Sequence, residues 1–224
     1  MKVSGKQFAR MLDATLTGAI ATHEETKRMM ALAKEYQFYS IIGPRCYLDE
    51  MVAGMKGTGV LVGAGCSNIT GADPAEIKAH FAKWHIAHGA DEIENIMNVS
   101  YLKSGLNDLV VKDVRAVRDA IGPDIPYKCI LEVCFLTDEE IATACNLLID
   151  GGVDYVKTST GKAGAATLHH IEVMANAVKG RVKIKAAGGI RTIEAVEQML
   201  ELGVDRFGVG LESAVNIMKQ ADAR

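Results

Sequence analysis

Two lysines in apolar, strand-like segments are the residues of this sequence best suited to chemistry. Lys157 ends the segment VDYVK (153–157), and Lys185 lies within VKIKAA (182–187). An ammonium group in a buried strand is costly unless it is paired, and burial lowers the pKa of a lysine. A lysine with a lowered pKa carries a free amine near neutral pH, which attacks carbonyl groups. Two such lysines on adjacent strands lower each other's pKa, so the pair predicts a nucleophilic amine.

The composition is typical of a globular protein, with 49% hydrophobic and 24% charged residues and a formal net charge of −3. Acidic and basic residues are interleaved, which favours neither nucleic acid nor a membrane surface as partner. No apolar run is long enough to cross a bilayer, and the first residues do not resemble an export signal. The five cysteines form no CxxC pair. We therefore expect a cytoplasmic protein with reduced thiols.

Strand-like and helix-like segments alternate along nearly the whole chain. Short apolar or β-branched runs predict strands near 11–16, 39–43, 59–63, 92–97, 127–133, 155–158, 183–187 and 206–210. Amphipathic patterns predict helices over 23–36, 74–88, 106–121, 137–150, 168–178 and 192–202. Thr137 before three acidic residues, and Asp73-Pro74 before Glu76, are typical of helix starts, and Gly203 is typical of a helix end.

Eight strand–helix units in 224 residues predict a (β/α)8 TIM barrel, an α/β fold, that forms a single domain over residues 1–224. The alternative is an open doubly wound sheet, and the absence of GxGxxG after the first strand counts against it. In a barrel the active site lies where the strands end, which is where Lys157 and Lys185 fall. Adjacent strands are about 4.8 Å apart, so both amines can reach one site. Alternation along the fifth strand places Lys128 and Glu132 on one face, where we expect them to pair.

Taken singly, these residues have structural explanations. Lys157 could extend from its strand end to solvent, and Lys185 could be an ion-pair partner of Glu94 or Glu132. His80, His85 and His88 lie on one predicted helix, and we expect them on its solvated face rather than as metal ligands. We expect no metal and no cofactor.

Two long motifs resemble those of the deoxyribose-phosphate aldolase family. They are YVKTSTGK at 155–162 and KAAGGIRT at 185–192, supported by segments 89–93, 102–105 and 128–140, and the likeness spans roughly residues 13–208. The family has a (β/α)8 barrel and forms a Schiff base with acetaldehyde. The resemblance implies that Lys157 is the Schiff-base lysine and that Lys185 depresses its pKa. It also implies that Glu94 occupies the position of the acid in the proton relay.

We further predict a set of substrate-binding residues, part of which the resemblance places around a substrate phosphate. The predicted set is Asp13, Thr15, Lys128, Thr158, Lys162, Gly188, Gly189, Arg191, Gly210 and Glu212. Of these, Lys162, the two glycines of 188–189 and Arg191 would lie near the phosphate. Asp13 and Thr15 match the family's early Asp-x-Thr element.

Three departures from the family pattern concern the acid and the phosphate loop. Glu94 stands where the family has aspartate, and residues 63–68 (GAGCSN) replace a Gly-Phe-Pro segment. Residues 208–213 (GVGLES) replace a hydroxyl-bearing phosphate loop. Glu212 falls where a helix N-terminus would favour an anion, so we expect it to compete with a substrate phosphate.

The sequence therefore predicts a metal-independent class I aldolase. The resemblance gives reversible cleavage of 2-deoxy-D-ribose 5-phosphate to acetaldehyde and glyceraldehyde 3-phosphate. Two alternatives stay open. One is the same Schiff-base chemistry with another or an unphosphorylated aldehyde acceptor, and the other is a non-catalytic barrel that binds a sugar phosphate. The expected partner is a small aldehyde or a sugar phosphate, and the sequence leaves a homo-oligomer open.

Overall fold

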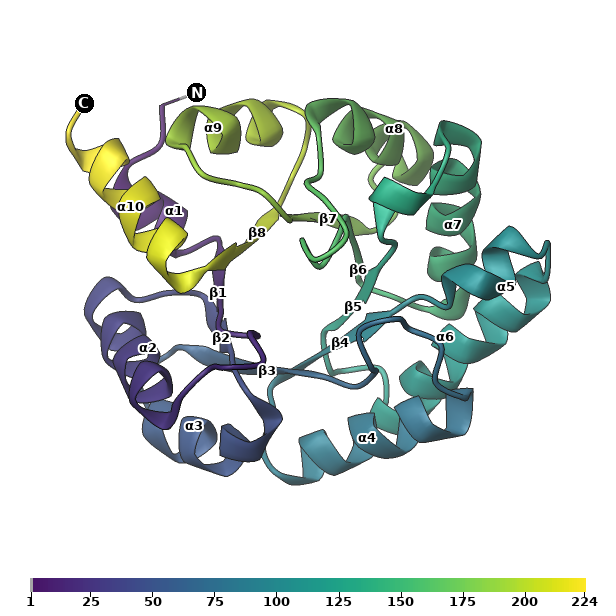
Figure 1. The fold of residues 1–224 in the computed structure, drawn as a ribbon, viewed down its shortest axis with the longest axis horizontal. Helices are drawn as coiled ribbons and strands as arrows, with labels where there is room; N and C mark the ends of the chain where they lie inside the picture. The colour runs from purple at the N-terminus through teal and green to yellow at the C-terminus, as the bar shows by residue number, and fades with distance from the viewer. Residues whose placement is uncertain (1) are drawn as a thin grey trace.

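Eight parallel strands close into a barrel in the computed structural model, which describes residues 2–224 (Figure 1). The strands are β1 (Leu12–Thr15), β2 (Ser40–Ile42), β3 (Leu61–Gly65), β4 (Glu92–Ile96), β5 (Tyr127–Ile130), β6 (Tyr155–Lys157), β7 (Lys183–Ala187) and β8 (Arg206–Gly210). Each strand pairs with the next along the chain, and β8 pairs with β1 to complete the ring. The predicted (β/α)8 fold is confirmed, and the open sheet is excluded.

Helices surround the barrel in chain order (Figure 1). They are α1 (Gly5–Ala9), α2 (His23–Tyr36), α3 (Leu48–Met55), α4 (Ala75–Ala87), α5 (Val99–Lys103), α6 (Asn107–Ile121), α7 (Asp138–Gly151), α8 (Leu168–Val178), α9 (Ile193–Glu201) and α10 (Leu211–Asp222). Two 3₁₀ turns, η1 (Arg45–Tyr47) and η2 (Val133–Phe135), follow β2 and β5. The six predicted helices are all present, within a residue at each end. The sequence analysis missed α1, α3 and α5, and it expected a helix start near Glu212, where α10 begins, without giving its range.

Local caps explain several of the helix starts. Thr137 caps α7 and forms a capping box with Glu140, as predicted, and Thr22 does the same with Glu25 at α2. The helix start predicted at Asp73-Pro74 is confirmed, since α4 begins at Ala75, but a capping box is absent there. Pro74 precedes α4 without a side-chain cap, while Asp73 accepts hydrogen bonds from the backbone and side-chain nitrogens of Asn68.

The apolar core lies between the strands and the helices, whereas the inside of the barrel is charged. Buried leucine, isoleucine, valine and methionine side chains from both layers form one continuous cluster. The side chains of Asp13, Glu94, Lys128, Lys185 and Arg206 are buried, although they are charged. Register places Glu94 opposite Lys128, and Lys185 opposite both Lys157 and Arg206. Because barrel interiors are usually filled by branched apolar side chains, this charged interior points to function.

The fifth strand ends earlier than predicted, and this changes the environment of Glu132. β5 stops at Ile130, and Glu132 adopts a left-handed backbone conformation with φ 58°. The expected pair between Glu132 and Lys128 is therefore wrong. Glu132 instead accepts a hydrogen bond from the backbone N–H of Thr160 in the loop after β6.

A buried ion pair joins two of the outer helices to the barrel. Lys78 of α4 donates to Asp113 of α6 over 2.7 Å and to the carbonyl oxygen of Ile96 at the end of β4 over 3.0 Å. Both charged side chains are almost fully buried. His85, on the same helix, is also buried, so its predicted position on a solvated face is wrong. Among residues 2–224, no helix is long and apolar enough to cross a membrane.

Removing one member of the buried pair should cost far more stability than removing both. Lys78→Met leaves the Asp113 carboxylate buried without its cation, which typically costs about 3–5 kcal/mol of unfolding free energy. The double variant Lys78→Met/Asp113→Leu should recover most of that loss. Urea unfolding measures both, and Lys103→Met, at an exposed pair with Glu140, is the control that should change little. A double variant as unstable as the single one would contradict this explanation.

Candidate active site

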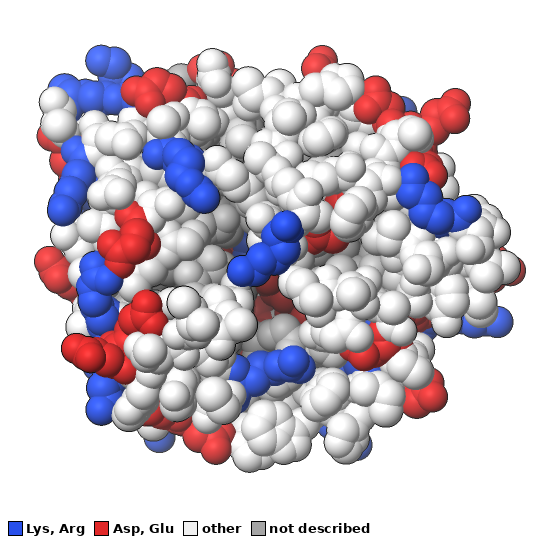
Figure 2. Space-filling model, in the orientation of Figure 1, with Lys and Arg blue, Asp and Glu red and all other residues white. Residues whose placement is uncertain are grey.

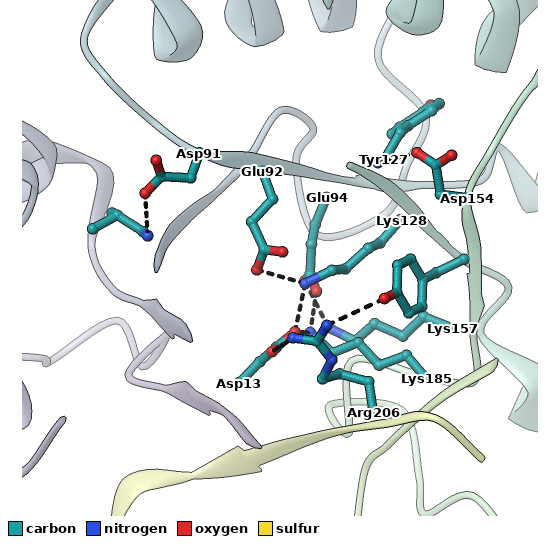
Figure 3. A network of polar contacts seen from close by, with 12 residues as sticks. Asp13, Asp91, Glu92, Glu94, Tyr127, Lys128, Asp154, Lys157, Lys185 and Arg206 are labelled. Atoms are coloured by element: carbon teal, nitrogen blue, oxygen red, sulfur yellow. Dashed lines mark hydrogen bonds and ion pairs between the residues drawn. The ribbon is translucent and has the colours of Figure 1, made fainter. Parts of the chain in front are cut away.

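Lys157 lies at the end of β6, and its amine contacts a carboxylate from β4, which one strand separates from β6. Its Nζ is 2.7 Å from Oε2 of Glu94, and only 5% of Lys157 is exposed (Figure 3). The other carboxylate oxygen of Glu94 contacts Nζ of Lys185. Glu94 thus bridges the two lysines that the sequence singled out. Lys185 also donates to Asp13, so its ammonium is held between two carboxylates.

Further ion pairs continue this cluster into the barrel (Figure 3). Lys128 Nζ lies 2.6 Å from both Asp13 and Glu92, and Arg206 lies 3.2 Å from the second oxygen of Asp13. The complete cluster contains four cationic side chains, Lys128, Lys157, Lys185 and Arg206, and three carboxylates, Asp13, Glu92 and Glu94. With every group ionised, it carries one excess positive charge. It becomes neutral when one lysine is a free amine.

The geometry favours Lys157 as that amine. Burial lowers its pKa and Lys185 lowers it further, while Glu94 opposes both, which leaves the pKa of Lys157 at about 8. Lys128 instead has its pKa raised, because Asp13, Glu92 and Glu94 outweigh the effect of burial. The resemblance attributed the lowered pKa of Lys157 to Lys185, whereas burial is the larger cause. A lysine with a pKa near 8 holds a useful fraction of free amine at neutral pH.

Two carboxylates of the cluster, Glu94 and Asp13, stay ionised. Burial alone would raise the pKa of Glu94, but Lys157, Lys185 and Lys128 together lower it to about 2. For Asp13, Lys128, Lys185 and Arg206 overcome burial and hold its pKa far below the usual range. Glu94 therefore enters the site as an anion that accepts protons rather than as an acid that supplies one.

A cavity of about 280 Å³ opens above Lys157 and Glu94. Its other walls come from the ends of the strands and from the segments that follow them, and they include Thr15, Thr17, Gly18, Ile42, Arg45, Gly65, Ser67, Ile96, Thr160 and Lys162. Figure 2 shows a hollow near the centre of this face, with acidic atoms at its floor and basic side chains at its rim. The size suits a short carbon chain attached to Lys157.

A second cavity, of about 360 Å³, adjoins the first and is lined mainly by backbone and charged groups. It shares Thr15, Thr17, Gly18, Thr160, Lys162 and Gly208 with the first. Its far wall holds Gly188 and Gly189, both with positive φ, together with Arg191 and the start of α10. Gly210 is the residue before α10 and has no side chain. It therefore provides no side-chain acceptor for the first N–H groups of this helix.

The structure brings most of the predicted substrate-binding residues to these cavities. Thr15, Lys162, Gly188, Gly189, Arg191, Gly210 and Glu212 line one or both of them. Asp13, Lys128 and Thr158 are instead fully buried and bonded to other protein groups. Thr158 exchanges hydrogen bonds with the backbone of Ala187 and so ties β6 to β7. These three therefore support the site from within rather than line it.

Sequence reasoning missed Arg28. This residue of α2 lines the second cavity and makes a two-oxygen ion pair with Glu212 of α10. The hydrogen bond from Arg28 lowers the pKa of Glu212. Glu212 lines the second cavity, and its carboxylate already has a cationic partner there. Among residues 2–224, no cluster of three His, Cys, Asp or Glu side chains is arranged to hold a metal ion.

A buried lysine with a lowered pKa, held by a carboxylate at the mouth of a (β/α)8 barrel, is the arrangement of an enzyme that forms Schiff bases with carbonyl compounds. Comparison with known proteins agrees. Residues 56–219 match the DeoC/LacD family aldolase, and the chain belongs to this family. It is an aldolase, a lyase.

The similarity to individual relatives extends over almost the entire chain. Deoxyribose-phosphate aldolase of Lysinibacillus sphaericus is 38% identical over 214 residues, 95% of each protein. That of Carboxydothermus hydrogenoformans is 34% identical over 97% of this chain and 96% of the relative. A crystal structure of a putative deoxyribose-phosphate aldolase from Coccidioides immitis superposes with a TM-score of 0.92 at 32% identity, covering 98% of this chain and 87% of that one.

The pKa of Lys157 should set the pH dependence of the reaction. The free amine is the reactive form, so kcat/KM should rise as pH increases through about 8. Lys185→Leu removes a neighbouring positive charge, which raises the pKa of Lys157 and moves the rise to higher pH. Lys183→Leu, an exposed charge on the same strand, is the control and should leave the profile in place. An unshifted profile in Lys185→Leu would mean that Lys185 acts only through contact.

Glu94→Gln should move the profile in the opposite direction. Glu94 raises the pKa of Lys157, so removing its charge while keeping its shape lowers that pKa. The rise in rate should then begin at a lower pH, even though the maximum rate falls because a proton acceptor is lost. The pH–rate profile of this variant, measured beside Lys185→Leu, checks the sign. A shift to higher pH would contradict the charge balance of the cluster.

Proposed function

We propose that this aldolase reversibly cleaves 2-deoxy-D-ribose 5-phosphate to acetaldehyde and glyceraldehyde 3-phosphate through a Schiff base on Lys157. The observation that carries the proposal is the buried Lys157 amine, 2.7 Å from Glu94, with a pKa of about 8. The activity named for the relatives from Lysinibacillus and Carboxydothermus supports the choice of substrate.

The first half of the reaction attaches the sugar to the enzyme. The free amine of Lys157 adds to C1 of the open-chain aldehyde, and the resulting carbinolamine loses water to give an iminium ion. The iminium nitrogen is an electron sink for the neighbouring carbon. Removal of the proton from the C3 hydroxyl then lets the C2–C3 bond break. Glyceraldehyde 3-phosphate leaves, and the bond electrons form an enamine on Lys157.

The second half returns the enzyme to its starting state. The enamine takes a proton at C2, and water hydrolyses the iminium to release acetaldehyde and the Lys157 amine. Glu94 is ionised and lies against Lys157, which suits it to accept protons and return them, through a water molecule where the distance requires it. Lys185 keeps Glu94 in place and adds to the positive field that favours the free amine.

The second cavity is where we place the phosphate group. Lys162 and Arg191 supply cations, and the backbone of Gly188 and Gly189 and the start of α10 supply N–H groups. Lys162 lines both cavities, so a chain attached to Lys157 extends past it into the second. An unphosphorylated acceptor would use only the first cavity. A preference for deoxyribose over deoxyribose 5-phosphate in the cleavage assay would support that alternative.

Acetaldehyde and borohydride should label one lysine. Borohydride reduces the iminium to a stable ethylamine, so peptide mass analysis should find the adduct on Lys157. Lys157→Ala should lose the label together with aldol cleavage, whereas Lys162→Ala should still be labelled at Lys157. A label that persists in Lys157→Ala would contradict the proposed nucleophile.

A cleavage assay tests the substrate itself. A coupled dehydrogenase follows the release of acetaldehyde from deoxyribose 5-phosphate and from deoxyribose.

We also propose that the chain forms a homo-oligomer. The aldolase from Aeropyrum pernix, described as a unique tetramer, superposes with a TM-score of 0.86 at 25% identity, over 96% of this chain and 91% of that chain. Light scattering coupled to size-exclusion chromatography measures the mass directly, and a monomer at micromolar concentration would contradict the proposal. The cytoplasmic location expected from the sequence stays a prediction.

A further inference from the structure

We propose that Arg28 is a specificity-determining residue for phosphorylated substrates, and that Glu212 holds its guanidinium at the second cavity until a phosphate replaces the carboxylate. This inference rests on the proposed function, because it concerns the same cavity. It adds a residue from α2 and assigns Glu212 a different role from direct repulsion of the phosphate.

The position of Arg28 is the first support. Arg28 and Glu212 both line the second cavity, although 184 positions separate them in the chain. Arg28 donates from two guanidinium nitrogens to the two oxygens of Glu212. This two-pronged geometry is the one that guanidinium groups use with phosphate as well as with carboxylate. The carboxylate therefore occupies the donors that a phosphate in the cavity would use.

The exposure of the pair is the second support. The side chains of Arg28 and Glu212 are 52% and 69% exposed. An ion pair this open to solvent is weak, so an incoming dianion can replace the carboxylate at small cost. A buried pair would instead fix Arg28 permanently. The released Glu212 side chain extends into solvent rather than becoming a buried, unpaired charge.

The neighbouring charges are the third support. Glu25 is the other acidic residue that lines this cavity, and its carboxylate already accepts hydrogen bonds from the N–H and hydroxyl of Thr22 in the capping box of α2. Arg28 lies one turn further along the same helix. The residues that line the wall at the start of α10 offer only Ser213 as a hydroxyl donor there. Arg28 of α2 therefore provides the positive charge that can bind an anion at this wall.

The experiment is a double-mutant cycle with Arg28→Gln, Glu212→Gln and the combined variant, assayed on deoxyribose 5-phosphate and deoxyribose at fixed ionic strength. Arg28→Gln should raise KM for the phosphorylated substrate about three- to tenfold, an effect larger on KM than on kcat and larger than its effect on the unphosphorylated substrate. Glu212→Gln frees Arg28 and should lower the same KM about two- to fivefold. In the Arg28→Gln background, Glu212→Gln should bring no gain. Lys27→Gln, an exposed charge next to Arg28 on α2, is the control and should change neither substrate.

Two results would overturn the inference. If Glu212→Gln improves KM equally with and without Arg28, Glu212 repels the phosphate directly and Arg28 takes no part. If Arg28→Gln leaves KM for the phosphorylated substrate unchanged, the guanidinium faces only Glu212 and solvent. Binding of inorganic phosphate, measured by calorimetry on the same four proteins, separates this inference from the proposed function. Should the wild type fail to cleave deoxyribose 5-phosphate, phosphate binding weakened by Arg28→Gln still supports the role of Arg28, and unchanged binding rejects it.

Discussion

The charge balance inside the barrel is the constraint on which the site depends. Four cations and three carboxylates are packed where most barrels hold apolar side chains, and water is almost excluded from them. In such a place an unpaired charge is expensive, so the cluster favours the state in which one lysine has lost its proton. Lys157 is the lysine of the cluster that lines the cavity, it forms one ion pair, with Glu94, and burial lowers its pKa to about 8. The nucleophile is therefore produced by the cluster as a whole rather than by one neighbour.

The two adjoining cavities suit different tasks, the first the covalent step on Lys157 and the second the recognition of an anion. The first is deep, with Lys157 and Glu94 at its floor, and there burial controls protonation. The second is built from glycine backbone, a helix start and exposed cations, which together provide a positive potential. Covalent chemistry needs a dry environment, and recognition of a dianion needs exchangeable partners. The loop after β6 serves both, since Lys157 precedes it and Lys162 lies within it.

Sequence patterns predicted the barrel well because each strand and most helices are encoded locally, by apolar runs, capping residues and glycine. They failed where the structure depends on distant segments. Alternation carried the fifth strand on to Glu132, but the chain turns into a left-handed conformation there, which a glutamate does not signal. Arg28 was missed because its contact with Glu212 depends on how α2 and α10 meet beside the closed barrel. Helix α1 has only five residues, too few for a periodic pattern. Helix α3 does carry one, because Leu48, Met51 and Met55 are buried on one face, and the sequence analysis overlooked it.

The length of the Glu94 side chain suits the distances between β4 and the two lysines that it contacts. Its strand, β4, is separated from Lys157 on β6 by one strand and from Lys185 on β7 by two, so its carboxylate must extend across the barrel interior. A glutamate extends farther than an aspartate by one methylene, and each oxygen of Glu94 meets a different lysine. Protonation of Lys157 and the position of Lys185 are thereby linked through one side chain. With a shorter acid on β4, one of the two contacts would be lost unless a strand moved. The length of the side chain at position 94 and the spacing of the two lysines therefore depend on each other.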